Sequence, residues 1–474
     1  MPPTAPAPRA ARPLLRSALV PLTIALVGAV TASCTNAKLD ESSSAAATTT
    51  TAATEFGEGS DAATIDPGGG RTGPITSGSS PLKGMKGAAP GIRITEDFRD
   101  RVRAVDGTVD DFTGAAEGYD IVMVLAISAE SARSDSPGRI ADEVISSTEG
   151  GRTCLGYHAC REFALDNTDF DYDGVSGNID LLANGDPGEA GFAVVEFTGT
   201  GALRAVDQVT VQSRPLADRP AGADPIYGPI GNGVLEIGTL LPVMGPDGAA
   251  ARAALAGAKV AVDEVNAEGG VLGEPVVLVP DESGDGSSSA TTDAVRRLIG
   301  RPVDAVIGGT VYGITSVAIP ELTDAGIILF SPTDTARALS VADDRGLFFR
   351  LSPPTDLEGQ VLGNLITNDG YTRVAIAAGT GDDNQELAAD IAAAINADSG
   401  TVTATVEVGD DPDGAAIAQQ LIDSDPQALV IVTSAPAAAL IVRGLVAKGK
   451  GPSTIATYGT AADMTDELAQ LVGG

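Results

Sequence analysis

The feature that most constrains the fold is an alternation of short apolar runs with helix-length amphipathic segments between residues 235 and 335. The runs at 304–307 and 327–330 are each followed at once by small or polar residues. This alternation is typical of a doubly wound α/β lobe, in which helices flank parallel strands. Such lobes bind ligands at the carboxyl ends of their strands. We therefore expect an α/β lobe that carries part of a binding site.

A second α/β set follows the first along the chain. The first set includes strand-like runs near 235–241, 275–279, 304–307, 327–330 and 347–350. The second has strand-like runs near 373–378, 402–408, 428–433 and 454–457, with helix patterns at 385–397, 413–423 and 436–447. The pattern predicts two lobes, each a mostly parallel sheet flanked by helices.

The segment before these lobes combines helices with a few strands. Helices are expected at 95–105, 112–132 and 137–147, and strands at 174–180, 191–197 and 209–211. So few strands do not make a stable sheet alone, so this segment needs a partner. A Pro-, Gly- and Ala-rich stretch at 213–232 separates it from the first lobe and reads as a linker.

The N-terminal sequence predicts export. Three arginines precede an apolar run at 17–30, which ends in Thr31-Ala32-Ser33-Cys34. A basic region, an apolar region and small residues make a secretory signal. The sequence before Cys34 resembles the bacterial lipobox, which implies cleavage after residue 33 and lipidation of Cys34. Residues 34–81, rich in Ser, Thr, Ala and Gly, are predicted to be a flexible tether to the extracytoplasmic face of the membrane.

Composition excludes some classes of function. The formal net charge of −34 opposes binding to nucleic acid, which requires a basic surface. The single histidine, His158, has no nucleophile and acid arranged around it in sequence, so we expect no catalytic residues and no cofactor.

Asp169 to Asp180 partly match a calcium loop, but the last position is Asp rather than Glu and a strand is predicted to follow. We expect no metal. Cys154 and Cys160 are expected to form a disulfide.

Residues 233–474 resemble the N-terminal two-thirds of type I periplasmic binding proteins of the branched-chain amino acid (leucine-binding) group. The matching motifs are GTLLP at 238–242, AKVAVDEVN at 258–266, GGVLG at 269–273, and AGI at 325–327 leading to Ser331-Pro332. Residues 82–212 resemble the C-terminal third of that group. Here the motifs are Tyr119-Asp120, the Cys154–Cys160 loop, FDYDGVSG at 170–177 and ANGDP at 183–187.

The two resemblances occur in swapped order, which implies a circular permutation of one two-lobed protein. Residues 82–167 would then complete lobe 1 (233–353), residues 168–212 would complete lobe 2 (354–474), and 213–232 would join the ancestral termini. The alternative is a tandem, with the tail of one binding protein fused to the head of another. Such a tandem would leave apolar sheet faces exposed. One folded module is therefore expected, with the helix at 112–132 packed on lobe 1.

The resemblance also implies a ligand site between the lobes. In lobe 1 it assigns ligand contacts to Tyr312, Asp334 and Thr335, and the same loops contain Thr310 and Ser331. In lobe 2 the candidates are Asp383, Ser434 and Tyr458. Helix N-termini can bind the carboxylate of an amino acid, and acidic side chains its ammonium group. These residue types are also common as turn and N-cap residues, which is the alternative interpretation.

The implied function is that of a lipid-anchored, extracytoplasmic substrate-binding protein of an ABC importer. It would close its lobes on an amino acid or related small polar solute, and a membrane permease would recognise the closed state. The resembled group often carries an aromatic residue near Asp383, and its absence here favours a cationic or amino-bearing solute. Two alternatives are a ligand sensor for a signalling partner and a structural lipoprotein that has lost binding.

Overall fold

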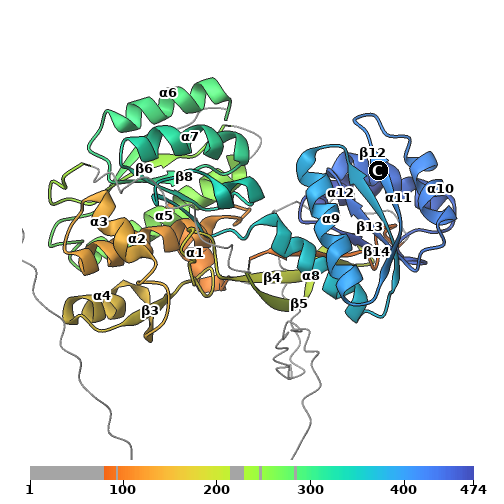
Figure 1. The fold of residues 1–474 in the computed structure, drawn as a ribbon, viewed down its shortest axis with the longest axis horizontal. Coiled ribbons are helices and arrows are strands. Elements are labelled where there is room, and N and C mark those ends of the chain that lie inside the picture. Colours follow the sequence, from red (N-terminus) through yellow and green to blue (C-terminus); the bar gives the residue numbers. More distant parts are fainter. Residues whose placement is uncertain (1–78, 92–93, 214–228, 245–247, 282–285, 474) are drawn as a thin grey trace, which may run out of the picture. The chain divides into compact units, whose positions relative to one another are not determined.

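A computed structural model describes residues 79–91, 94–213, 229–244, 248–281 and 286–473 (Figure 1). The predicted signal sequence, Cys34, most of the tether and most of the 213–232 linker lie outside these residues. None of the helices in the described ranges is long and apolar enough to cross a membrane.

Lobe 1 contains a five-stranded parallel sheet in the order β10-β9-β8-β6-β7. Its strands are β6 (Glu236–Leu240), β7 (Val277–Asp281), β8 (Ala305–Gly308), β9 (Ile328–Ser331) and β10 (Phe348–Arg350). Its helices are α5 (Gly248–Ala267), α6 (Ser288–Ile299), α7 (Tyr312–Asp324) and the short 3-10 helix η1 (Arg337–Val341). Every residue of β8 and β9 is buried, as expected for parallel strands covered by helices on both faces.

Lobe 2 contains a seven-stranded mixed sheet in the order β12-β11-β13-β14-β1-β4-β5. Its parallel strands are β11 (Arg373–Gly379), β12 (Thr401–Val408), β13 (Ala428–Val432), β14 (Ala456–Gly459) and β1 (Lys86–Pro90). The antiparallel pair is β4 (Glu189–Phe197) and β5 (Leu203–Gln212). Its helices are α8 (Thr355–Asn368), α9 (Asp382–Ala397), α10 (Gly414–Asp423), α11 (Ala435–Ala447) and α12 (Asp466–Gly473).

The early segment is divided between the two lobes. Helices α1 (Glu96–Val105), α2 (Ala115–Ala132), α3 (Pro137–Val144) and α4 (Gly156–Asp166) share one apolar core with lobe 1. The expectation that the helix at 112–132 packs on lobe 1 is confirmed, because α2 lies against α5. Gly118 and Gly257 let the two backbones meet: a Cβ at either one would overlap a carbonyl oxygen of the facing helix.

Several details differ from the sequence prediction. Residues 168–212 were assigned to lobe 2, but Phe170, Tyr172 and Leu181 lie in the core of lobe 1. Residues 86–90 were assigned to lobe 1, but β1 pairs with β14 and β4 in the sheet of lobe 2. Residues 174–180 were predicted to be a strand, but only the preceding β3 (Phe170–Asp173) is one, paired with β2 (Arg152–Leu155). The chain leaves the strand because the buried Asp120 carboxylate accepts the backbone N–H groups of Val175 (3.1 Å) and Ser176 (2.7 Å).

The predicted pairing of Cys154 with Cys160 is present in the structure. Cys154 lies in β2, and Cys160 lies in α4, a helix that the sequence analysis did not predict. Arg161 of the same helix donates from Nε to Glu130 Oε1 at 2.8 Å, and the Tyr157 hydroxyl donates to the Gly270 carbonyl at 2.8 Å. The disulfide therefore closes a small unit that is hydrogen-bonded to α2 and to lobe 1.

Candidate functional site

The first half of the candidate site is formed by the loops after β8 and β9. The Ser331 hydroxyl donates to the Gly309 carbonyl at 2.5 Å and so joins the two loops. Thr310 is buried, and its hydroxyl has no hydrogen-bond partner within the described parts of the chain. Tyr312 is the first residue of α7 and is 45% exposed. Ser331 therefore holds the two loops together, whereas the hydroxyl groups of Thr310 and Tyr312 are candidates for hydrogen bonds to a ligand.

Asp334 is buried at the end of the second loop. Its carboxylate accepts the Thr315 hydroxyl and, at 3.0 Å, the backbone N–H of Ala336. Burial raises the pKa of Asp334 above its usual value; these two hydrogen bonds and Arg350 oppose the rise, and the negative charge of Asp383 adds to it. The Asp334 carboxylate therefore has hydrogen-bond partners within lobe 1, and the negative charge of Asp383 in lobe 2 also affects its pKa. Thr335 contributes its carbonyl, which accepts the Thr355 N–H at 3.0 Å.

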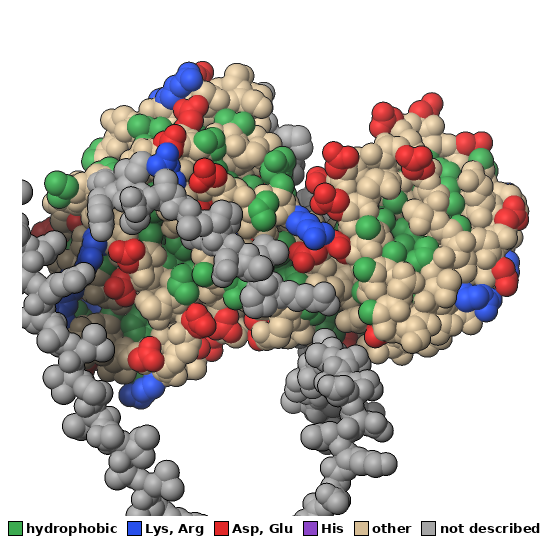
Figure 2. All heavy atoms as spheres, viewed as in Figure 1, with side chains coloured by type: hydrophobic (Ala, Val, Ile, Leu, Met, Phe, Trp, Pro, Cys, Tyr) green, Lys and Arg blue, Asp and Glu red, His purple; other side chains and the backbone are tan. Residues whose placement is uncertain are grey.

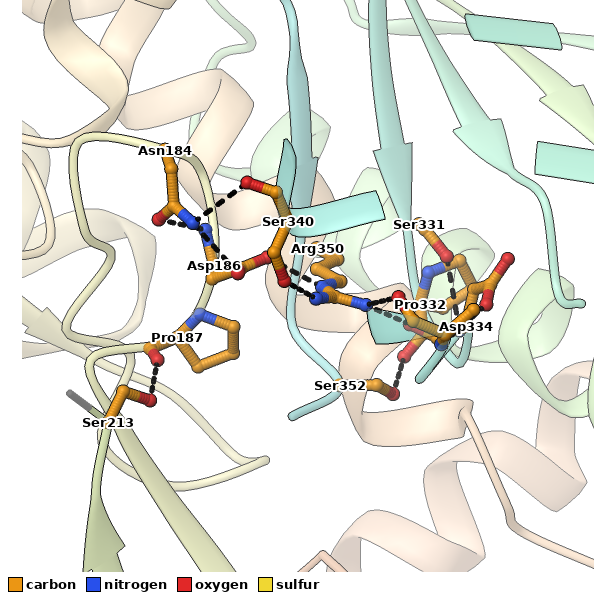
Figure 3. Close-up of polar contacts among 11 residues, drawn as sticks. Asn184, Asp186, Pro187, Ser213, Ser331, Pro332, Asp334, Ser340, Arg350 and Ser352 are labelled. Atoms are coloured by element: carbon orange, nitrogen blue, oxygen red, sulfur yellow. Dashed lines mark hydrogen bonds and ion pairs between the residues drawn. The ribbon is translucent and has the colours of Figure 1, made fainter. Parts of the chain in front are cut away.

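A buried arginine organises this loop (Figure 3). Arg350, which has no exposed surface, donates from Nη1 to the carbonyls of Asp334 (3.2 Å) and Ala336 (2.8 Å). Its Nη2 donates to the Ser340 hydroxyl at 2.7 Å, and its Nε to the Asp186 carboxylate at 2.7 Å. The sequence analysis did not identify Arg350 or Asp186. The available signal was an arginine that ends the otherwise apolar run at 347–350.

The second half of the candidate site follows β11 and β13 in lobe 2. Asp383 is exposed in the first turn of α9, and Ser434 is exposed at the N-cap of α11 without a side-chain cap hydrogen bond. Strands β11 and β13 are adjacent and parallel, so both residues lie at the same edge of the sheet. Figure 2 shows acidic side chains far outnumbering basic ones on the face drawn.

Tyr458 does not belong to this group. It was expected after the last strand, but it lies within β14 and is buried. Its hydroxyl donates to Asp369 Oδ2 at 2.5 Å, and Lys86 Nζ contacts the same oxygen at 2.8 Å. Asp369 precedes β11 whereas Asp383 follows it, so the Tyr458 hydroxyl points to the opposite edge of the sheet.

Two buried acids near the end of β14 were missed. Asp463 is completely buried, and neither carboxylate oxygen has a hydrogen-bond partner in the described ranges. Glu358 of α8 is also buried and accepts the Ala461 N–H at 2.7 Å. Burial raises the pKa of Glu358 to about 7; burial and then the nearby Glu358 charge raise that of Asp463 well above its usual value. No spacing in the sequence indicated that these residues meet.

The chain forms two α/β lobes, each with polar loops at its strand ends. Chain segments pass from one sheet to the other and connect the lobes. This is the architecture of a two-lobed binding protein. Residues 234–474, just over half of the chain, match the periplasmic binding protein family. The chain belongs to this family, which is one of binding proteins rather than enzymes.

Individual relatives cover parts of the chain. The "Leu/Ile/Val-binding protein BraC3" of Rhizobium johnstonii is 30% identical over 175 residues, which are 36% of this chain and 46% of that protein. The "Chemotactic signal transduction system substrate-binding protein BasB" of Halobacterium salinarum is 28% identical over 203 residues, 38% of this chain and 49% of that protein. The chain spans about half the length of these curated relatives.

Solved structures show similar partial coverage. A putative branched-chain amino acid ABC transporter protein from Rhodospirillum rubrum has 26% identity and a TM-score of 0.44, covering 51% of this chain and 68% of that one. The substrate-binding protein LivJ of Streptococcus pneumoniae in complex with isoleucine has 22% identity and a TM-score of 0.42, covering 50% and 67%.

Proposed function

We propose that the protein is the substrate-binding protein of an ABC importer and that it captures an amino acid or related small solute carrying a cationic group. The proposal is supported by the position of Asp334 and Asp383, which follow strands of the two lobes, where the charge of Asp383 acts on Asp334. The negative charge of Asp383 disfavours ionisation of Asp334. A cation held near both carboxylates would remove that repulsion, so a positively charged solute gains most from the two together.

Neutral groups complete the proposed site. The Thr310 and Tyr312 hydroxyls in lobe 1 and the Ser434 hydroxyl in lobe 2 supply polar contacts, and the first turns of α7 and α9 supply backbone N–H groups for a solute carboxylate. A solute that contacts both lobes stabilises the closed state, which a permease then recognises. Family membership and the relatives named for Leu/Ile/Val binding support the amino acid class.

A thermal-shift screen tests this function. Lysine, arginine and other amino-bearing solutes should raise the melting temperature, whereas leucine should have less effect; a solute at 100 times its Kd adds about 2.7 kcal/mol to the free energy of unfolding. Asp383→Asn should weaken binding by about 10- to 100-fold, as expected for loss of a charge-assisted hydrogen bond. Glu386→Gln, at an exposed position in the same helix, is the control. A panel of amino acids and amides in which no solute shifts the melting temperature contradicts the proposal.

A sensing role is the second candidate, since one relative is named for chemotactic signal transduction. Pull-down of membrane partners with and without solute separates the two roles: a permease is expected for an importer and a transducer for a sensor. Lipid anchoring through Cys34 is part of our proposal for either role. Cys34→Ala should then release the protein from the membrane fraction, whereas retention there contradicts the anchor.

We also propose that the chain order is a circular permutation. This is supported by the division of residues 79–213 between the two lobes: β1, β4 and β5 extend the sheet of lobe 2, while α2 packs on α5 of lobe 1. A rearranged chain, with 233–474 placed before 79–212, should fold with the same solute affinity and a similar melting temperature. A stable, independently folded 82–212 fragment in limited proteolysis contradicts permutation.

A further inference from the structure

A small cavity lies where chain segments pass between the two lobes. Its volume is about 40 Å³, which is room for about two or three water-sized groups. The wall includes residues 90–91 after β1, residues 189–191 at the start of β4, and residues 351–353 between β10 and α8. We call this the hinge cavity. It is built from other residues than those of the proposed solute site.

Glu117, in the first turn of α2, lines the hinge cavity. Within the described part of the chain, its carboxyl group accepts its own backbone N–H and no side-chain donor. The nearby acids are Asp120 on the same helix, whose charge acts on Glu117, and Glu189 of β4, which also lines the cavity. Asp120 is already bonded to Tyr172 and to the 175–176 backbone. Among the described lining residues there is no lysine or arginine.

Two neutral polar side chains of the wall, Ser352 and Asn178, also offer hydrogen-bond acceptors. The Ser352 hydroxyl donates to the Pro332 carbonyl at 2.7 Å, so its oxygen is left to accept. The Asn178 side chain donates from Nδ2 to Asp180 at 2.9 Å, which leaves its amide oxygen as an acceptor. The Glu117 carboxylate with these neutral oxygens, in a space of this size and with Glu189 also in the wall, matches a small cation. Ca²⁺ takes about six to eight oxygen ligands and Mg²⁺ keeps several of its waters, so neither fits a space for two or three water-sized groups.

We propose that the hinge cavity binds a monovalent cationic group at Glu117, either a free cation such as NH₄⁺ or K⁺ or the primary ammonium end of a solute. If the cavity binds a free cation, this site is independent of the proposed solute-binding function. If it binds the ammonium end of a solute, the inference rests on that function. Because the wall is made of segments from both lobes, an occupied cavity holds these segments together. Cation binding should therefore stabilise the folded protein.

The protonation of Glu117 gives the proposal a pH signature. Burial raises the pKa of Glu117 to about 7, with Asp120 adding to the rise. Only the ionised carboxylate binds a cation, so affinity should be full above pH 7 and fall about tenfold for each pH unit below it. Stabilisation by cations should be clear at pH 8 and nearly absent at pH 5.

The test is a melting-temperature titration at pH 8, with NH₄Cl, KCl, NaCl or methylammonium chloride replacing choline chloride at constant ionic strength. Choline is too large for the cavity, so exchange should raise the melting temperature saturably. Glu117→Gln should abolish the shift, Ser352→Ala should reduce it, and Glu407→Gln, at an exposed position in β12, should leave it unchanged. A shift with methylammonium alone assigns the site to an ammonium end, and a shift with KCl to a free cation.

Two outcomes overturn the proposal. The first is the lack of a saturable shift with any of these cations at pH 8. The second is a shift that persists in Glu117→Gln, which would mark a general salt effect. Neither outcome affects the amino acid screen, whose signal depends on Asp383, so failure of this site and failure of the proposed function are distinguishable.

Discussion

The Arg350 guanidinium donates from Nε to the Asp186 carboxylate at 2.7 Å, and both side chains are buried. The two residues lie 164 positions apart, Arg350 in β10 and Asp186 in the segment between β3 and β4. The backbones meet as well, because the Arg350 N–H donates to the Gly185 carbonyl at 3.0 Å. The pair thus holds part of the early segment against lobe 1, directly behind the Asp334 loop.

Breaking this pair should be costly. Asp186→Ala leaves the Arg350 charge buried without its partner, and we expect a loss of about 3–5 kcal/mol in the free energy of unfolding, measured by urea denaturation. Asp100→Ala is the control, because its contact with Arg103 is exposed and should change stability by less than about 1 kcal/mol. Equal losses in the free energy of unfolding for the two variants would contradict the prediction that the buried Arg350–Asp186 pair matters more than an exposed pair.

The close approach of α2 and α5 makes a second prediction. Gly118→Ala places a methyl group against the Ala254 carbonyl, and Gly257→Ala places one against the Ala115 carbonyl. Each should lower the free energy of unfolding by about 1–3 kcal/mol or more, since backbone must move to relieve the overlap. Gly313→Ala, in helix α7 with no atom within 4 Å of the new methyl group, should be stabilising by about 0.5–1 kcal/mol. Urea denaturation of the three variants measures these changes in the free energy of unfolding.

The strands of both lobes could be predicted because each is an apolar run bounded by glycine or polar residues. Strand β1 could not, since its sequence KGAAP has no such pattern. It becomes a strand through pairing with β14 and β4, which are distant in sequence. The predicted strand at 174–180 failed for a related reason: the Asp120 carboxylate captures its N–H groups, and only tertiary structure brings Asp120 there.

The candidate site was predictable to the level of loops but not of side-chain direction. Asp334 and Asp383 follow predicted strands, and the structure places them at strand ends. Tyr458 was assigned by the same rule, yet β14 lies two residues later than the predicted strand, so Tyr458 is inside the strand and its side chain points away from those ends. Arg350 and Asp186 were missed because a buried ion pair depends on a contact that no local pattern specifies.

The disulfide should make a modest contribution to stability. Cys154 and Cys160 are six positions apart, and closing so short a loop is worth about 2 kcal/mol on the loop-entropy estimate. We expect Cys154→Ser/Cys160→Ser to lower the free energy of unfolding by about that amount while the protein stays folded, since hydrogen bonds of Arg161 and Tyr157 still hold α4. Wild-type protein with a reductant should match the double variant; a complete loss of structure in either contradicts this prediction.

The buried acids near β14 should make stability depend on pH. The pKa of Glu358 is about 7 in the folded protein against 4.5 ordinarily, so the folded state binds its proton more tightly than the unfolded state. This contribution is complete below pH 4.5 and is lost as pH rises to 7, at about 1.4 kcal/mol per pH unit. Asp463, whose pKa is also raised, adds a loss of the same sign.

Glu358→Gln and Asp463→Asn should therefore be more stable than wild type at pH 8 and similar to it at pH 4. Exposed Glu386→Gln should follow the wild-type profile at both pH values. If urea denaturation instead shows both buried-acid variants destabilised at pH 8, the two carboxylates are ionised and paired in the folded protein.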